Sequence, residues 1–179
     1  ISMWIDRQAG SNATRPGGEP RGLFHPDSPW ANPDFRTWPG FDPANKQRDR
    51  AEAKRLMAEA GYPNGFKASF LCRSVNWVPE CEFFAEQLRT LGVDVTIDMR
   101  GIADYEQAGC AGDYDLRIGG GGISAPFPES ARDPTSSVDV NPCATTKHRD
   151  PKVDSFFQEL FKTTSFERRV EIARDLERY

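Results

Sequence analysis

The histidines of this chain give little basis for catalysis. Two are present, His25 in a proline-rich stretch and His148 between a lysine and an arginine. A Ser/His/Asp triad needs a histidine that a carboxylate orients beside a nucleophile, and the sequence contains no G-x-S-x-G nucleophile elbow. We therefore expect both histidines to be surface residues rather than catalytic bases.

The cysteines allow two interpretations. They stand at Cys72, Cys81, Cys110 and Cys143, and no two form a C-x-x-C pair, which argues against a zinc site and thioredoxin-like chemistry. Their even number allows one or two disulfides in an oxidising compartment. Small buried or isolated thiols are the equally open alternative.

The carboxylates do not indicate a catalytic pair. Five aspartates lie at predicted strand or loop ends: Asp94, Asp98, Asp113, Asp115 and Asp133. A glycosidase needs two acids about 5–10 Å apart across a cleft, and this spacing marks no such pair. The sequence therefore predicts no catalytic residue, no metal site and no cofactor, and we expect the chain not to be an enzyme.

A run of four glycines, residues 119–122, is the most informative local feature. Gly120-x-Gly122-x-x-Ala125 formally matches the dinucleotide fingerprint, which works only when a helix follows. Pro126 and Pro128 follow instead, so we do not expect nucleotide binding. Successive glycines permit close backbone approach and positive φ, and this run follows a predicted strand, where open α/β sheets bind ligands.

Polar and aromatic residues also follow the first predicted strand. Asn76 and Trp77 come directly after it, with Arg73 nearby. The tryptophan could stack on a ligand or form a partly buried cap on the sheet edge. The arginine could pair bidentately with a carboxylate or be a surface charge.

These positions depend on an alternating order of helices and strands. A helix is expected from an Asp49–Glu52 capping box to Gly61, and later helices from Asp150-Pro151 and from a Thr164–Glu167 box. Strands and helices then alternate at 67–72 (strand), 79–92 (helix), 93–98 (strand), 103–110 (helix) and 114–118 (strand), and residues 119–141 form a loop. This order predicts an α/β fold, a mixed sheet flanked by helices.

Residues 12–45 contain seven prolines together with several large apolar residues. Proline disfavours regular structure, while a disordered linker would lack the aromatic content. We expect an extended loop packed on the surface of a single domain, residues 1–179.

The net charge of −4 and the absence of a basic run argue against nucleic acid and a membrane surface as partners. No stretch reaches the roughly 18 apolar residues of a membrane span. Residues 1–7 look like the middle of a helix and residues 175–179 lack a stop signal, so we expect both ends to be cut.

Several segments, in order, resemble one family. Residues 53–66, A-K-R-L-M-A-E-A-G-Y-P-N-G-F, resemble the A-K-x-L-L-A-E-A-G-Y-P-x-G-F segment of the family 5 extracellular solute-binding proteins, the peptide- and nickel-binding components of ABC importers. Residues 5–7 are similar to an I-D-R that ends a helix in their second lobe. Residues 86–95 resemble their helix–strand unit, and Tyr114-Asp115 their YD strand.

The resemblance implies one lobe of a type II periplasmic-binding-protein fold, with the first lobe of the same protein missing. It also implies a periplasmic or extracellular location, capture of a peptide or related small solute by closure of two lobes, and a membrane permease as partner. The second lobe contributes the loops 73–77 and 119–125. The expected ligand-binding residues are Asn76, Trp77, Gly120, Gly121, Gly122, Ile123 and Ser124.

One departure from the family pattern concerns peptide recognition. Family peptide binders carry G-W-x-x-D after the YD strand, and here Gly-Gly-Gly-Gly-Ile-Ser-Ala stands instead. Two other functions remain as alternatives. One is a small α/β hydrolase with Asp or Cys, for instance Cys110 or Cys143, as nucleophile; the other is an interaction domain with Trp30, Trp38 and Phe41 exposed as a patch.

Overall fold

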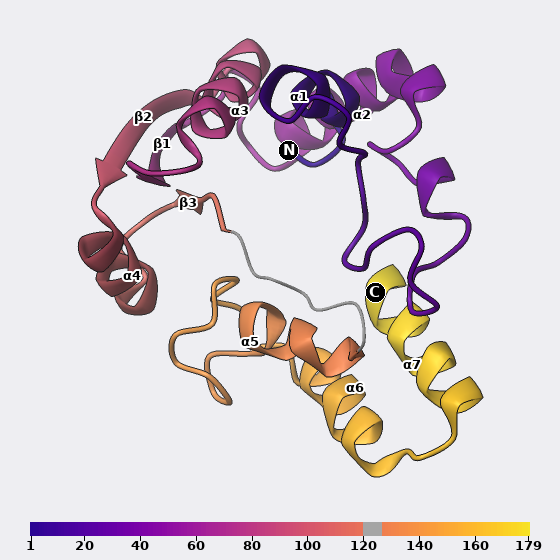
Figure 1. The fold of residues 1–179 in the computed structure, drawn as a ribbon. Helices are drawn as coiled ribbons and strands as arrows, with labels where there is room; N and C mark the ends of the chain where they lie inside the picture. The colour runs from indigo at the N-terminus through magenta and orange to yellow at the C-terminus, as the bar shows by residue number, and fades with distance from the viewer. Residues whose placement is uncertain (120–126) are drawn as a thin grey trace. The chain divides into compact units, whose positions relative to one another are not determined.

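The computed structural model describes residues 1–119 and 127–179, which divide into two compact units (Figure 1). Unit 1 holds residues 1–20, 36–109 and 113–118. Unit 2 holds residues 21–35, 110–112 and the described part of 119–179. Each unit has an apolar cluster of its own, and the expectation of a single domain over residues 1–179 stays a prediction.

Unit 1 is built on a parallel sheet. The described strands β1 (Lys67–Arg73), β2 (Asp94–Arg100) and β3 (Leu116–Arg117) form three strands in the order β2-β1-β3. Helices α3 (Val78–Leu91) and α4 (Ile102–Ala111) connect them. The predicted helix-flanked α/β sheet is confirmed. Both described strand pairings are parallel rather than mixed, as helical crossover connections require.

The alternation of side chains along β1 assigns one helix to each face of the sheet. Phe70 and Cys72 belong to the cluster that contains Leu88 of α3, whereas Leu71 packs with Tyr105 of α4. Figure 1 shows these two helices on either side of the strands. The sheet is thus covered on both faces, and its strand ends are left to form a site.

The N-terminal segment differs from the prediction. Residues 1–5 form turns, and α1 (Arg7–Thr14) begins after Asp6, whose side chain accepts a hydrogen bond from the Ala9 N–H at 2.9 Å. The expectation that residues 1–7 lie within a helix, and that residues 5–7 end one, is therefore wrong. The carboxylate of Asp6 is a helix N-cap instead.

The next helix, α2 (Lys46–Glu59), begins before the predicted capping box. The side chain of Asp49 is buried, and it accepts a hydrogen bond from the Gly40 N–H at 2.7 Å rather than capping the helix. The predicted end is confirmed, because Gly61 takes the left-handed conformation with φ +88° that suits a helix C-terminus.

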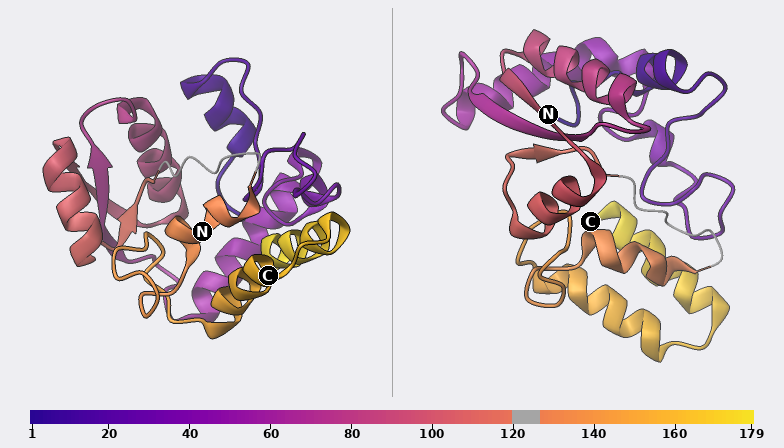
Figure 2. Two further views of the ribbon diagram at one scale, coloured as in Figure 1. Left: turned by 60° about the horizontal axis from the view of Figure 1, so that its bottom comes forward. Right: turned by 60° about the vertical axis from the view of Figure 1, so that its left-hand side comes forward.

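Unit 2 contains a helical hairpin formed by α6 (Pro151–Lys162) and α7 (Phe166–Arg178), seen side by side in Figure 2. Asp150 caps α6 as predicted, accepting from the Lys152 N–H at 2.8 Å. The cap of α7 is Ser165, one residue after the predicted Thr164. The predicted loop 119–141 also contains a 3-10 helix (Pro128–Ala131) and α5 (Arg132–Thr135).

The proline-rich stretch 12–45 is mostly turns and irregular chain, apart from the end of α1 and two 3-10 helices, Phe35–Thr37 and Pro43–Asn45. Phe24 and Trp30 are 2% and 5% exposed and pack in the core of unit 2 with Phe157 and Leu160 of α6. In the described ranges, no helix combines the length and apolarity needed to cross a bilayer.

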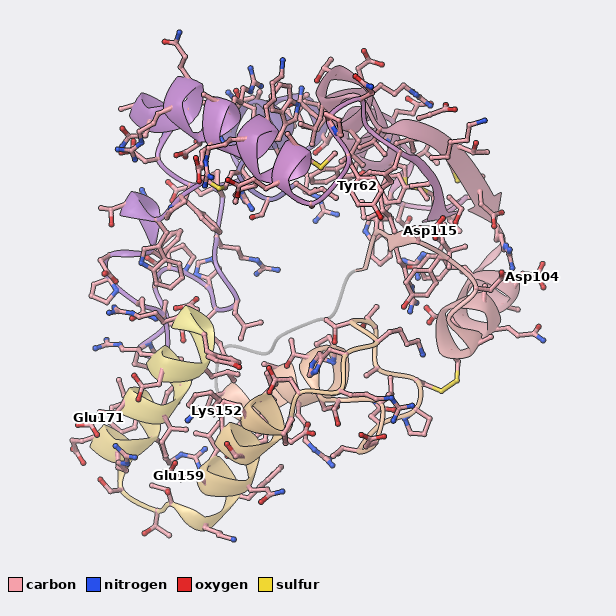
Figure 3. All side chains as sticks on the ribbon, turned by 180° about the vertical axis from the view of Figure 1, so that it is seen from behind. Tyr62, Asp104, Asp115, Lys152, Glu159 and Glu171 are labelled. Carbon is pink, nitrogen blue, oxygen red and sulfur yellow. A yellow bond between two sulfur atoms is a disulfide. The ribbon has the colours of Figure 1, made fainter. Side chains whose placement is uncertain are left out.

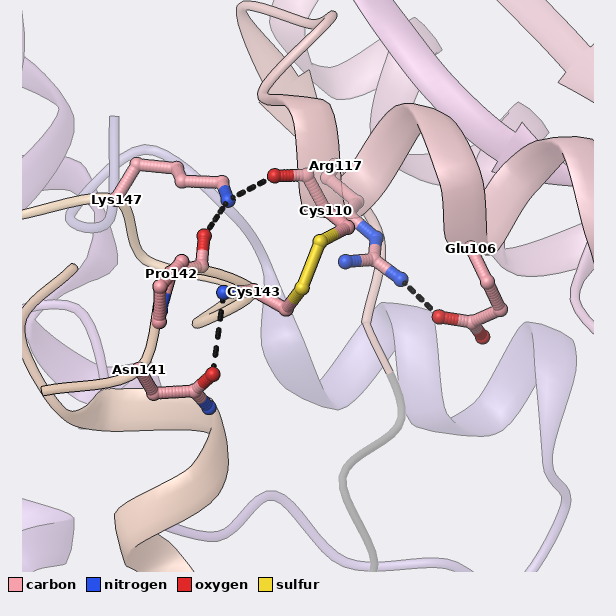
Figure 4. Close-up of a disulfide and its surroundings, with 7 residues drawn as sticks. All are labelled: Glu106, Cys110, Arg117, Asn141, Pro142, Cys143 and Lys147. Carbon is pink, nitrogen blue, oxygen red and sulfur yellow. Dashed lines mark hydrogen bonds and ion pairs between the residues drawn. A yellow bond between two sulfur atoms is a disulfide. The ribbon is translucent and has the colours of Figure 1, made fainter.

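Two disulfides settle the alternatives left open for the cysteines. Cys72 is bonded to Cys81, and Cys110 to Cys143. Figure 4 shows the second bond, beside which the Lys147 ammonium donates to the carbonyls of Cys110 and Pro142 at 2.8 Å each. Disulfides of this kind are typical of proteins in oxidising compartments.

Candidate functional site

The carboxyl ends of β1 and β3 lie side by side. Leu71 pairs with Arg117 in the parallel register, and the Ile118 N–H donates to the Leu71 carbonyl at 3.2 Å. The two loops singled out in the sequence therefore leave the sheet at the same edge. In open α/β sheets this edge is where ligands bind.

Side chains hold the short strand β3 in place. The Asp115 carboxylate (Figure 3) accepts hydrogen bonds from the Ser69 N–H at 2.7 Å and the Ser69 hydroxyl at 2.8 Å. These bonds lower the pKa of Asp115. At the other end of β3, the Tyr105 hydroxyl donates to the carbonyl of Ile118, so the exit of the chain from the sheet is fixed on both sides.

The loop after β1 is closed by covalent and main-chain contacts. The Cys72–Cys81 disulfide joins the last residues of β1 to the first turn of α3. The Ser74 N–H donates to the Arg100 carbonyl at 2.8 Å, and the Cys81 N–H donates to the Trp77 carbonyl at 2.9 Å. Between them the exposed Asn76 adopts φ +75°.

Trp77 is half-buried at this edge, against Leu71 and Tyr105. Its ring meets the Tyr105 ring edge-on, with centroids 6.3 Å apart, and the Arg73 guanidinium carbon lies 4.0 Å from its centroid. The tryptophan thus caps the sheet edge and also carries a cation on one face. A solute approaching that face would meet the guanidinium of Arg73.

Arg73 differs from the other arginines near this edge. Arg100 contacts Asp98 and Asp113, whose hydrogen bonds raise its pKa, and Arg117 pairs with Glu106 at 2.9 Å. No carboxylate in the described ranges pairs with Arg73, and its Nε atom is buried without a hydrogen-bond partner. Among the described residues, the guanidinium is therefore stabilised by the faces of the Trp77 and Tyr105 rings, whose centroids lie 4.0 and 6.0 Å from its carbon.

The structure places two of the predicted ligand-binding residues. Asn76 and Trp77 lie in the loop at the carboxyl edge of the sheet, while the other five, Gly120, Gly121, Gly122, Ile123 and Ser124, lie outside the described residues and stay predictions. Sequence reasoning missed Tyr105, which is 1% exposed and contacts both Trp77 and Ile118. An aromatic residue in a helix otherwise expected to be polar was the available signal.

The other groups considered in the sequence have structural contacts. His25 is exposed; the ring of His148 contacts the Thr135 carbonyl through Nε2 and accepts from the Asp150 N–H through Nδ1 at 3.0 Å. Within residues 1–119 and 127–179, leaving aside the side chain of Asp133, no group of three or more His, Cys, Asp or Glu side chains is placed to hold a metal.

The structure bears on the cysteines of the hydrolase alternative and on the aromatic patch of the interaction alternative. The sulfurs of Cys110 and Cys143 are bonded to each other and are not free nucleophiles. The aromatic patch is not formed either, because Trp30 is buried, Trp38 and Phe41 are half-buried, and the Arg7 guanidinium lies 4.2 Å from the Phe41 centroid.

Unit 2 contains a surface pocket of about 580 Å³ along α7. Arg168 pairs with Glu159 at 2.6 Å and Arg178 with Asp34 at 3.2 Å, and Arg174 donates to the carbonyls of Ala31 and Pro29. The arginines of this pocket already have polar partners, whereas the Arg73 guanidinium in unit 1 has no carboxylate partner among the described residues.

The family described as bacterial extracellular solute-binding proteins, family 5, middle part, matches residues 1–141. No curated protein sequence matches the chain. Among solved structures, the chain is similar to a dipeptide-binding protein from Pseudoalteromonas sp. SM9913 in complex with Met-Leu, with a TM-score of 0.81 and 22% identity over 98% of this chain and 36% of that one.

Two other structures resemble it over 99% of its length at 20% identity. OppA from Haemophilus influenzae, in complex with RPPGFSPFR, gives a TM-score of 0.77 and is covered over 35% of its chain. AgaA from A. tumefaciens R10, in complex with agropinic acid, gives 0.72 and is covered over 36%. The present chain thus spans about a third of the length of these proteins, and at this identity the likeness shows the fold, a type II periplasmic-binding-protein lobe.

Proposed function

The chain belongs to the bacterial extracellular solute-binding proteins of family 5, and on this premise we propose that it is the solute-capturing part of an ABC importer system. It would bind a peptide or related small molecule without making or breaking a bond. Its location would be periplasmic or extracellular, in keeping with two disulfides. The partner that receives the solute would be the membrane permease of the importer.

The observation that carries this proposal is the carboxyl edge of the parallel sheet. Arg73 is the last residue of β1, Asn76 and Trp77 lie in the loop that follows it, and the chain leaves β3 at the same edge. The edge brings together an exposed amide, an aromatic ring and a guanidinium without an acidic partner in the described ranges. Such a combination suits noncovalent recognition of a polar organic molecule.

Arg73 gives the proposed solute a chemical character. A guanidinium binds carboxylates through two parallel hydrogen bonds, so we expect the solute to carry a carboxylate. The molecules named with the similar structures, a dipeptide, a nonapeptide and agropinic acid, show that this fold accommodates solutes of very different size. The remaining contacts would come from the rest of the protein, because closure of two lobes places the solute between them.

The proposal is tested with the full-length gene product purified under native conditions. Native mass spectrometry should show a mass increment that is lost on denaturation, and calorimetry after exchange of the retained solute should show saturable binding. An R73A variant should bind a carboxylate-bearing solute at least about tenfold more weakly, the equivalent of one lost charge-assisted hydrogen bond. Non-catalytic capture would be refuted if the protein converted the solute chemically and showed no binding apart from that turnover.

The matched control is R55A, because Arg55 lies on the exposed side of α2 and pairs with Glu52. Its removal should leave affinity unchanged. Equal losses in both variants would show that net charge, rather than the Arg73 site, controls binding.

A further inference from the structure

The Cys72–Cys81 disulfide surrounds the candidate site in sequence. Its cysteines are nine positions apart, and Arg73, Asn76 and Trp77 all lie between them. Both cysteines are 0% exposed and belong to the apolar cluster of unit 1. The disulfide therefore attaches both ends of a solvent-facing loop to a rigid core.

The loop itself has little packing of its own. Ser74, Val75 and Asn76 are exposed, Val75 to 44%. Asn76 is in the left-handed region at φ +75°, which residues other than glycine seldom adopt. The main-chain hydrogen bonds that restrain the loop include those from the Ser74 N–H to the Arg100 carbonyl and from the Cys81 N–H to the Trp77 carbonyl. With so little packing, an open loop would sample many conformations, and the disulfide reduces their number.

We propose that the Cys72–Cys81 disulfide is a positioning device for the solute site, holding the Arg73 guanidinium over the Trp77 ring. A short closed loop has fewer conformations than an open one, and a binding group held in place loses less entropy when solute arrives. The cysteines act through Arg73 and Trp77 and need not touch the solute. The expected effect on solute affinity rests on the proposed function. The expected effect on the contact between the Arg73 guanidinium and the Trp77 ring does not.

Fluorine NMR of the chain labelled with 5-fluorotryptophan tests the positioning role without any ligand. The chain has four tryptophans, Trp4, Trp30, Trp38 and Trp77, and W77F assigns the resonance of interest. In C72A/C81A we expect the Trp77 resonance to move and broaden, because its ring is no longer fixed against Arg73. In C110A/C143A it should stay at its wild-type position.

Trp4 reports whether the core survives the substitution. It is 7% exposed, and its indole N–H donates to the Gln87 carbonyl of α3 at 2.8 Å, in the same cluster as both cysteines. An unchanged Trp4 resonance with a changed Trp77 resonance supports the proposal. A second variant, C72V/C81A, restores buried volume. If the Trp4 resonance disappears from its wild-type position in both variants, the disulfide is a requirement of the fold and the positioning role is wrong.

Binding is measured separately on the full-length protein, with the dipeptide Met-Leu as the probe. C72A/C81A should weaken binding at least about tenfold, and C110A/C143A by less than about twofold. An unchanged Trp77 resonance, or a changed resonance with unchanged affinity, overturns the proposal. A wild-type protein that binds no Met-Leu counts against dipeptide capture, and the fluorine spectrum still decides the role of the disulfide in the stack.

Discussion

The two disulfides of this chain differ in burial and in loop length, and we expect them to have different roles. Cys72 and Cys81 are completely buried and nine positions apart, whereas Cys110 and Cys143 are exposed and 33 positions apart. In the chain-entropy account, stabilisation grows with the logarithm of loop length, giving about 3 kcal/mol for the short loop and about 4 kcal/mol for the long one. The short bond has the smaller entropic effect on stability, yet it encloses the candidate solute loop.

The largest expected effect is on reduction by dithiothreitol. The exposed Cys110–Cys143 bond should be reduced at least about 100-fold faster than the buried bond, whose sulfurs become accessible only when the core opens at a cost of several kcal/mol. Alkylation followed by peptide mass spectrometry measures both rates. Equal reduction rates would show that burial does not protect the Cys72–Cys81 bond, and the predicted difference between the two disulfides would be wrong.

The second prediction concerns stability. C110A/C143A should lower the free energy of unfolding by about 4 kcal/mol, the chain-entropy value for the long loop, as measured by urea unfolding. The free energy of unfolding of C72A/C81A is the quantity to compare. Loss of the short disulfide restores less chain entropy, but the two alanines leave a cavity in a packed core. A loss below about 1 kcal/mol in C110A/C143A would contradict the assignment of the long loop to global stability.

Tyr105 is expected to give a moderate effect. Y105F removes the hydroxyl that bonds the Ile118 carbonyl, next to Trp77, and leaves that carbonyl without its side-chain donor. A loss of about 1–2 kcal/mol of unfolding free energy follows. Y62F is the control, because Tyr62 is 48% exposed, and it should lie within about 0.5 kcal/mol of wild type.

The smallest effect is the acid dependence carried by Asp115, which anchors β3 within the loop that the Cys110–Cys143 bond closes. Its pKa is lowered in the folded chain by hydrogen bonds from Ser69. Its contribution is therefore present above the unfolded pKa of about 3.9 and is lost as pH falls through the lower folded value. D115N should destabilise the chain slightly at pH 7 and reduce the loss of stability below about pH 4, measured by thermal unfolding across pH. An identical pH dependence in both proteins would remove Asp115 as the titrating anchor.

Local signals in the sequence predicted most elements of unit 1. Gly61 and Gly92 end their helices in left-handed conformations, with φ +88° and +107°, as their positions after apolar helical stripes indicated. Asp49 was misread, since an acidic residue at the start of a helical pattern looks like a cap whether it faces solvent or, as here, the Gly40 N–H. That choice depends on a chain segment nine residues earlier, which periodicity cannot reveal.

The candidate site was predictable only where local sequence signals determine it. Placing Asn76 and Trp77 after a strand was enough to put them at the sheet edge, because parallel strands share one carboxyl edge. The pairing of Cys72 with Cys81, the stack of Arg73 on Trp77 and the contact of Tyr105 all depend on tertiary positions. Sequence spacing alone leaves four cysteines with three possible pairings.

The most direct test is the structure of the full-length protein with the solute it retains on purification. We expect a solute carboxylate within hydrogen-bonding distance of the Arg73 guanidinium, and solute atoms against Trp77 or Asn76 at the carboxyl edge of β1 and β3. A solute bound elsewhere, with Arg73 paired to a carboxylate of the protein itself, would contradict the assignment of this edge as the binding site.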